Sequence, residues 1–103
     1  MGDGGKRAIA LNGRDNVAVV LARCERSDRI EVFSKEGILV ERLTAVSTVE
    51  RGHKVALAEL AEGDGVIKYG EVIGAVSRPV ARGDFVHAHN MESCRGRGDH
   101  AQQ

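Results

Sequence analysis

A glycine recurs at the same place in three stretches of this sequence. The stretches are "VERGHKVAL" (49–57), "LAEGDGVIK" (60–68) and "VARGDFVHA" (80–88). In each, an apolar residue is followed by two residues and a glycine, then by two residues and a valine. Glycine adopts positive φ at little steric cost, so the pattern predicts a tight turn that leads into a short strand. The copies are unevenly spaced, which argues against a solenoid.

The rest of the chain also has the character of β-strands. "NVAVVLARC" (16–24) is rich in β-branched residues, and "RIEVFS" (29–34) alternates apolar and polar residues. "GILVERLTAV" (37–46) opens on Gly37, a predicted turn, whereas "VALAEL" (55–60) is compatible with a helical turn. Because aromatic residues make up only 3% of the chain, the core must be built from Val, Ile, Leu and Ala. We expect an all-β fold of short strands and glycine corners.

Length, charge and cysteine content narrow the class of protein. The 103 residues suffice for one domain, expected over 8–92 with polar tails at 1–7 and 93–103. A net charge of zero, without a basic stripe, argues against nucleic acid as a partner. The sequence offers neither a membrane span nor a signal peptide, and Cys24 and Cys94 are interpreted as reduced thiols, so we expect a cytoplasmic protein.

Two histidines stand close together near the end of the apolar pattern. They are His87 and His89 in "GDFVHAHN" (83–90). In a strand, residues i and i+2 point to the same face, and two neutral imidazoles on one face can share a divalent metal. The alternative is an exposed or merely hydrogen-bonded pair, and the pattern alone favours that alternative.

Other polar residues beside the glycines are weaker candidates. His53 and Lys54 follow a turn glycine, where a solvated pair is the simpler interpretation. Lys68 and Tyr69 lie in "IKYGE", where they could hold a substrate carboxylate and hydroxyl or form a polar strand end. Asn90 could hold a substrate oxygen or end a strand.

Several of these stretches together resemble a known family. "GHKVAL" (52–57), "VIKYGEVIG" (66–74) and "GDFVHAHN" (83–90), preceded by "RDNVAVVL" (14–21), resemble the small subunit or N-terminal domain of the altronate and galactarate dehydratases. The similarity extends over 9–92. It implies a SAF domain, a β-clip of short bent strands, in agreement with the strand and turn patterns.

The resemblance also implies a chemistry. Members of the family eliminate water from sugar acids to give 2-keto-3-deoxy acids, and a relative removes sulfite from sulfolactate. A divalent metal, Fe2+ or alternatively Mn2+, would stabilise the enolate-like intermediate. The implied roles are metal ligation or proton transfer for His87 and His89, proton donation to the leaving group for His53, binding of carboxylate and hydroxyls for Lys54, Lys68 and Tyr69, and orientation of a hydroxyl for Asn90.

We therefore expect the small subunit of a metal-dependent hydro-lyase that acts on a sugar acid. A chain of this size has little room to enclose such a substrate, and it ends about where the family's large catalytic domain would begin. A separate large subunit is the expected partner. The alternatives are the small subunit of a sulfolactate-type sulfo-lyase, a non-catalytic module that binds acidic sugars, and a structural subunit that only docks a partner. Pairing of two copies through strand edges stays open.

Overall fold

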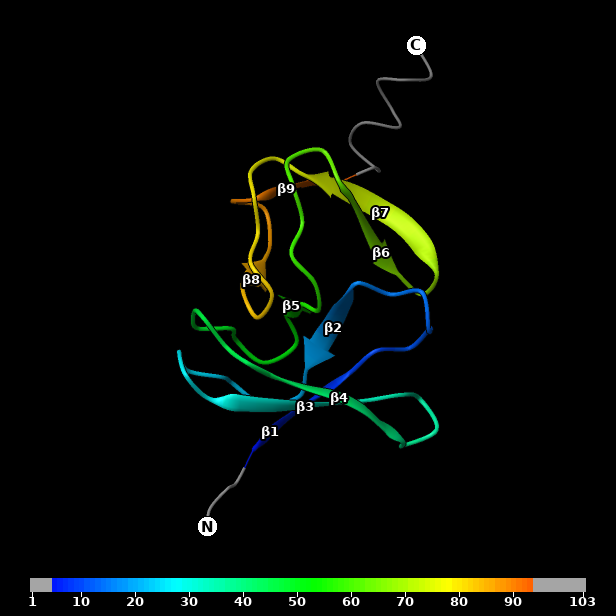
Figure 1. Cartoon of the computed structure of the whole chain (residues 1–103), viewed down its shortest axis with the longest axis vertical. Coiled ribbons are helices and arrows are strands. Elements are labelled where there is room, and N and C mark those ends of the chain that lie inside the picture. The colour runs from blue at the N-terminus through cyan, green and yellow to red at the C-terminus, as the bar shows by residue number, and fades with distance from the viewer. Residues whose placement is uncertain (1–4, 94–103) are drawn as a thin grey trace.

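The computed structural model describes residues 5–93, which fold into short strands in two sheets (Figure 1). The strands are β1 (Lys6–Ile9), β2 (Val17–Val20), β3 (Arg29–Phe33), β4 (Leu39–Thr44), β5 (Lys54–Ala56), β6 (Gly65–Lys68), β7 (Glu71–Val76), β8 (Phe85–Val86) and β9 (Met91–Ser93). The described residues contain no helix, so none there could cross a membrane. The prediction of an all-β fold is confirmed. Cys94 and most of the C-terminal tail lie outside the described residues.

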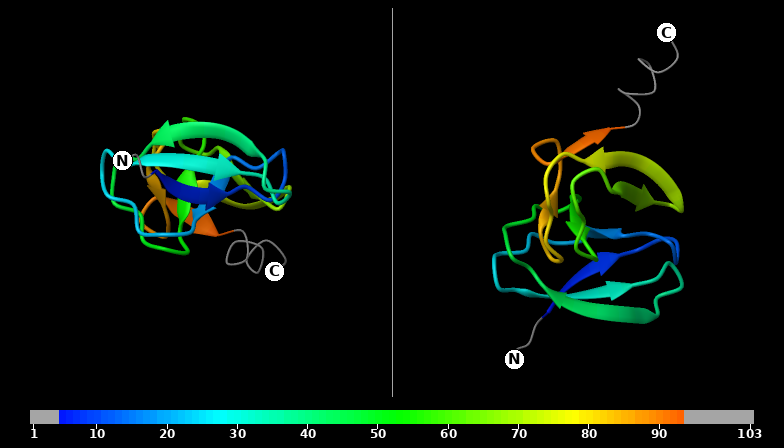
Figure 2. Two further views of the ribbon diagram at one scale, coloured as in Figure 1. Left: turned by 90° about the horizontal axis from the view of Figure 1, so that it is seen from below. Right: turned by 45° about the horizontal axis from the view of Figure 1, so that its top comes forward.

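The two sheets occupy opposite ends of the molecule. The larger sheet has the order β4-β3-β1-β2-β5-β8, and the smaller has the order β6-β7-β9. Only β1 and β3 are parallel; the other pairs are antiparallel. In Figures 1 and 2 the smaller sheet caps the end opposite to the β1–β4 layer, and β5 and β8 lie between them. The first and last strands reach slightly beyond the expected bounds of 8–92, since β1 begins at Lys6 and β9 ends at Ser93.

The three predicted glycine turns are present, and the structure adds a fourth. Gly52, Gly63 and Gly83 have φ of 84°, 93° and 92°, and Ser27 has a φ of 80° in an equivalent turn. With the residues before each turn included, the chain contains one nine-residue repeat four times. The copies are "VLARCERSD" (20–28), "AVSTVERGH" (45–53), "ALAELAEGD" (56–64) and "VSRPVARGD" (76–84), called copies 1 to 4 below.

The copies hold one another in reciprocal pairs. In copies 1 and 2, the N–H of Ser27 donates to the carbonyl of Ala45, whose own N–H donates to Asp28. Gly52 bonds the carbonyl of Val20 in the same way, and the N–H of Val20 donates to His53. Copies 3 and 4 repeat this arrangement with Gly63 on Val76 and Gly83 on Ala56. Each pair is completed by an antiparallel bridge, Cys24 with Val49 and Leu60 with Val80. We call this arrangement the clamp.

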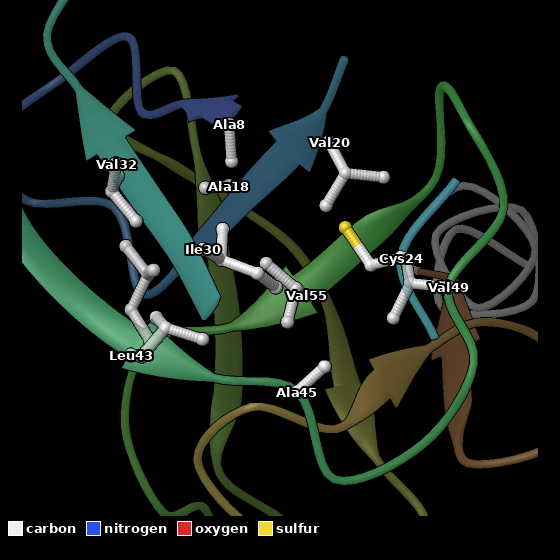
Figure 3. Packing of buried hydrophobic residues seen from close by; sticks show 11 residues of the cluster. Ala8, Ala18, Val20, Cys24, Ile30, Val32, Leu43, Ala45, Val49 and Val55 are labelled. Atoms are coloured by element: carbon white, nitrogen blue, oxygen red, sulfur yellow. The ribbon is translucent and has the colours of Figure 1, made fainter. Parts of the chain in front are cut away.

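Each clamp encloses its own apolar core. The first and fifth residues of every copy are buried, and so is the second residue after the end of each copy. Copies 1 and 2, with the strands that follow them, contribute Val20, Cys24, Ile30, Ala45, Val49 and Val55 to one cluster, seen in Figure 3. Copies 3 and 4, with the strands that follow them, contribute Ala56, Leu60, Val66, Val76, Val80 and Val86 to a second cluster. The fold is thus two similar halves, each with a small aliphatic core.

The region that was compatible with a helical turn runs from β5 through a bend at residues 57–58 to a bridge at Leu60, so that interpretation was wrong. β5 ends at Ala56, and the N–H of Leu57 donates to the carbonyl of Asn16. Leu60, three residues after Leu57, forms a bridge with Val80. These bonds to distant parts of the chain use the backbone groups that a helical turn would pair within itself.

The positive φ of Ser27 predicts a gain in stability on substitution with glycine. A non-glycine residue in the left-handed region costs roughly 1–2 kcal/mol, part of which is offset by the greater entropy loss of glycine on folding. Ser27→Gly should therefore stabilise the protein by about 0.5–1 kcal/mol and raise Tm by a few degrees in thermal unfolding.

Gly83→Ala is the opposing variant. Its φ is 92°, and an added Cβ would lie 2.2 Å from the carbonyl oxygen of Thr44. We expect this variant to be strongly destabilised. A Ser27→Gly protein that melts below the parent would contradict the equivalence of the four turns.

Candidate functional site

The loop after β8 places the two histidines. His87 and His89 do not continue the strand, since β8 ends at Val86 and residues 87–90 form a bend and turn. The prediction that both lie on one face of a strand is therefore wrong. The physical reason is Asn90, whose Oδ1 accepts the N–H of His87 (2.9 Å) and whose Nδ2 donates to the carbonyl of Phe85 (2.8 Å). This side chain takes the backbone groups that would have continued the ladder.

The two histidines still converge, because both contact the ring of Phe85. The centroid of the His87 ring lies 5.4 Å from that of Phe85 in a stacked arrangement, and that of His89 lies 5.1 Å from it. Sequence reasoning missed Phe85. An aromatic residue two positions before the first histidine, in a chain with 3% aromatic residues, was the available signal.

His53 joins the same group of rings from another part of the chain. β5 and β8 pair antiparallel, with Lys54 opposite Val86, so the residue before β5 lies beside the residue after β8. The His53 ring lies 5.1 Å from that of His87 and 5.6 Å from that of Phe85, edge-on to both. The turn of copy 2 and the loop after copy 4 are thus brought together by strand pairing.

Two lysines lie near these rings and add positive charge to the group. Lys54 is half-buried in β5, and Lys68 is the last residue of β6. Burial lowers the pKa of Lys54, and the charge of Lys68 lowers it further. No carboxylate within residues 5–93 forms an ion pair with either lysine. The cationic corner is defined here as His53, Lys54, Lys68, His87 and His89.

The corner also affects the proton affinity of its central histidine. Desolvation lowers the pKa of His87, and His53, Lys54 and His89 lower it further. The surroundings therefore favour the neutral form of the His87 imidazole over the charged form. A neutral imidazole can accept a proton or a metal ion.

The β6–β7 turn follows directly after Lys68. Tyr69 and Gly70 have φ of 57° and 76°, the combination of a type I′ turn, in which asparagine and glycine are preferred. Tyr69 is 59% exposed, and its ring centroid lies 5.2 Å from Nζ of Lys68. The N–H of Gly70 donates to Oδ1 of Asp15 (2.8 Å). Tyr69 is thus a bulky residue in a strained conformation, exposed to solvent, at a position where asparagine is usual.

Asp15 and Asn16 position this hairpin, and sequence reasoning missed both. Asn16 donates through Nδ2 to the carbonyl of Gly65 (2.9 Å), and its Oδ1 accepts the N–H of Ile67 (2.7 Å). These contacts join residues about fifty positions apart in the chain, so no local pattern could have identified them.

The corner does not provide a complete metal site. Among residues 5–93, no group of three or more His, Cys, Asp or Glu side chains could hold a metal ion. The rings of His87 and His89 both pack against Phe85 instead of converging with a carboxylate. The described residues therefore do not by themselves fit the metal that the resemblance implies.

The corner is also open. Two hollows of about 400 and 600 Å³ lie elsewhere, the first between the β1–β2 and β3–β4 connections and the second beside Leu60 and Val80. Neither is lined by a residue of the cationic corner. A substrate at the corner would thus be covered from one side only by this chain.

The sequence of this chain matches the model of the altronate/galactarate dehydratase SAF domain over residues 6–94. The chain belongs to this family. It is 31% identical to the altronate dehydratase of Bacillus subtilis over 88 residues, and 40% identical to that of Escherichia coli over 85 residues. These alignments cover 85% and 82% of this chain but 16% of each relative.

A shorter relative matches as well. The chain is 48% identical to the (2R)-sulfolactate sulfo-lyase subunit alpha of Paracoccus pantotrophus over 54 residues, which is 52% of this chain and 81% of that subunit. The all-β architecture agrees with the SAF domain that the family model describes. This chain thus spans about a sixth of the length of the altronate dehydratases that it matches.

The contacts of Asn90 predict a mainly structural role for its side chain. Asn90 is 2% exposed, and Asn90→Ala removes a buried donor and a buried acceptor at once. We expect a loss of about 2–3 kcal/mol in the free energy of unfolding, measured with urea. Asn90→Asp keeps the acceptor for His87 and should lose less. Unchanged stability in Asn90→Ala would instead favour the substrate-binding role.

The surroundings of His87 predict how its charge depends on pH. In a titration followed by NMR, the pKa of His87 should lie below the ordinary value, and Lys54→Ala should raise it. Since the folded state disfavours the imidazolium, the associated stability is present above pH 6.5 or so and is lost as the pH falls below that value. A pKa that Lys54→Ala leaves unmoved would mean that Lys54 does not act on His87.

Proposed function

We propose that this SAF domain binds the carboxylate end of a sugar acid and acts as the small unit of a cytoplasmic hydro-lyase, beside a larger unit that completes the active site. The observation that carries the proposal is the cationic corner. Three segments that are distant in the sequence bring two lysines and three histidines together there. Holding the two lysine charges near one another costs free energy, and an anionic ligand would offset this cost.

The two lysines are the proposed carboxylate-binding groups. Lys54 is half-buried and lies within the electrostatic influence of Lys68, and neither has an ion-pair partner among residues 5–93. Tyr69, exposed beside Lys68, can donate its hydroxyl to a substrate oxygen. A bound carboxylate would raise the pKa of Lys54, so ligand binding and the charge of this lysine are coupled.

The histidines supply groups for proton transfer in an elimination of water. The reaction removes a proton from the carbon next to the carboxylate and a hydroxyl from the neighbouring carbon. His87 is the proposed base, because its surroundings favour the neutral imidazole, which can accept a proton. His53 or His89 would donate a proton to the departing hydroxyl, which leaves as water. The resulting enol then tautomerises to the 2-keto-3-deoxy acid.

A divalent metal, Fe2+ or Mn2+, would be held mainly by residues outside this chain. The described residues do not form a three-ligand site. The larger unit would therefore supply most of its ligands, with His87 or His89 as an additional contact. The histidines, and not the metal, would carry out the proton transfers.

A sulfo-lyase is the second candidate. It is favoured by the 48% identity to the sulfolactate sulfo-lyase alpha subunit, most of whose length is covered by the alignment. Sulfolactate also carries a carboxylate next to the carbon that loses a proton, so the same corner could bind it. The two candidates differ in the leaving group.

The test is a lyase assay that follows formation of the 2-keto acid. The chain would be mixed with altronate, galactarate or sulfolactate and Fe2+, with and without the large dehydratase unit. We expect turnover only in the mixture, and a loss of at least about a hundredfold in Lys54→Ala or His87→Ala. Lys35→Ala, in the exposed β3–β4 connection, is the matched control.

The outcomes separate the candidates. Release of sulfite from sulfolactate, without turnover of altronate or galactarate, would favour the sulfo-lyase. Turnover that is unchanged in both variants would remove the corner from the reaction. Binding of a sugar acid without turnover in any mixture would favour a non-catalytic binding module.

A further inference from the structure

The ninth residue of the repeat is an aspartate in three copies, and these aspartates bond to nearby polar groups. Asp28 accepts the N–H of Glu25 through Oδ2 (2.8 Å), and Asp64 accepts the N–H of Ala61 in the same way (2.8 Å). Asp84 accepts the N–H of Phe85 and a hydroxyl from a neighbouring loop. In copies 1 and 3 the aspartate closes the turn by accepting the N–H of the residue three positions before it, whereas in copy 4 it bonds the next residue and a serine.

Copy 2 departs from this rule, since His53 takes the place of the aspartate. The backbone is otherwise the same: the N–H of His53 donates to the carbonyl of Glu50, as Asp28 does to Glu25, and Gly52 has the expected positive φ. Both of these copies even carry the same "ER" before the turn. The substitution therefore does not follow from a different turn geometry.

The His53 side chain is directed to the cationic corner instead. Its ring is edge-on to those of His87 and Phe85, and its nearest backbone contact is a 3.3 Å approach of Nδ1 to the carbonyl of Arg51. An aspartate here would bring a negative charge next to Lys54 and His87. It would pair with the groups that are otherwise available to an anion. Copy 2 is the one copy without an aspartate at the ninth position, and its histidine faces the cationic corner, so the corner accounts for the exchange better than the turn does.

We propose that His53 keeps the cationic corner free for an external anion and itself contacts that ligand. An aspartate at this position would suit the turn better but would occupy the positive groups. The inference rests on the proposed function, because it assigns the specificity of the same corner. It goes beyond that function in predicting that the best residue for folding and the best residue for binding differ at this position.

The experiment is an exchange of residues between turns in the full chain. His53→Asp installs the aspartate of the other three copies, and His53→Asn installs a neutral side chain that can make the same turn bond. Asp64→His is the matched control, since it makes the reverse change in a turn away from the corner. Lys54→Ala reports on the corner itself. Thermal unfolding measures stability, and NMR shifts on titration with galactarate measure binding.

We expect His53→Asp and His53→Asn to melt a few degrees above the parent. His53→Asp should weaken galactarate binding by at least about tenfold, and His53→Asn by less, because only the aspartate adds a negative charge. Asp64→His should lower the melting temperature and leave binding unchanged.

The contrary results are distinct. If Lys54→Ala weakens binding and His53→Asp does not, the corner binds anions but His53 does not reserve it. If His53→Asp melts below the parent, His53 is a structural residue of its turn and the inference is wrong. If the unsubstituted chain gives no galactarate shifts, or Lys54→Ala leaves them intact, the proposed function fails and this inference fails with it.

Discussion

The reciprocal clamp between copies of the nine-residue repeat is the interaction on which this fold depends. In each half, the turn of one copy bonds the strand end that precedes the turn of the other, and the second copy returns the same two bonds. Each turn is thus held both by its own backbone bond and by its partner copy. The buried residues at the first and fifth positions are thereby carried into one cluster, so backbone pairing and apolar packing enforce the same geometry.

The clamp explains how so small a chain can do without aromatic residues in most of its core. Valine, isoleucine, leucine and alanine fill two clusters, and the turns between them keep the strands short. Gly83 is an example of the close packing that results, since its Cα faces the carbonyl of Thr44 with no space for a Cβ. Arg82 ties the halves together by bonding the carbonyls of Leu57 and Arg42.

The cationic corner is built where the two halves meet. β5 leaves the turn of copy 2 and β8 leaves the turn of copy 4, and their antiparallel pairing brings His53 beside His87. Asn90 closes the loop from inside, and Asp15 anchors the hairpin that carries Tyr69. Strand ends therefore place His53, Lys54 and Lys68, and a loop held by Asn90 places His87 and His89, although the corner itself is open. This arrangement supports the proposal of a domain that supplies one wall of a larger site.

Much of the fold could be predicted from local patterns, because turns and strands are local structures. The positive φ of three glycines and most strands followed from glycine spacing and β-branched runs. The fourth copy was missed because Ser27 carries no glycine signal, although its backbone has the same conformation. The strand prediction for His87 and His89 failed because Asn90, a residue outside the pattern, competes for the backbone.

The fold class, the family and the residue types from which a site could be made were all predictable from the order of the amino acids. Those properties depend on short-range conformational preference and on motifs that can be recognised in order. Only the tertiary structure decided which of these residues meet. It joined His53 to His87, set Lys54 near Lys68 and buried Asn90. The reason is that these contacts arise from strand pairing between distant copies of the repeat, and the register of that pairing is set by the clamp.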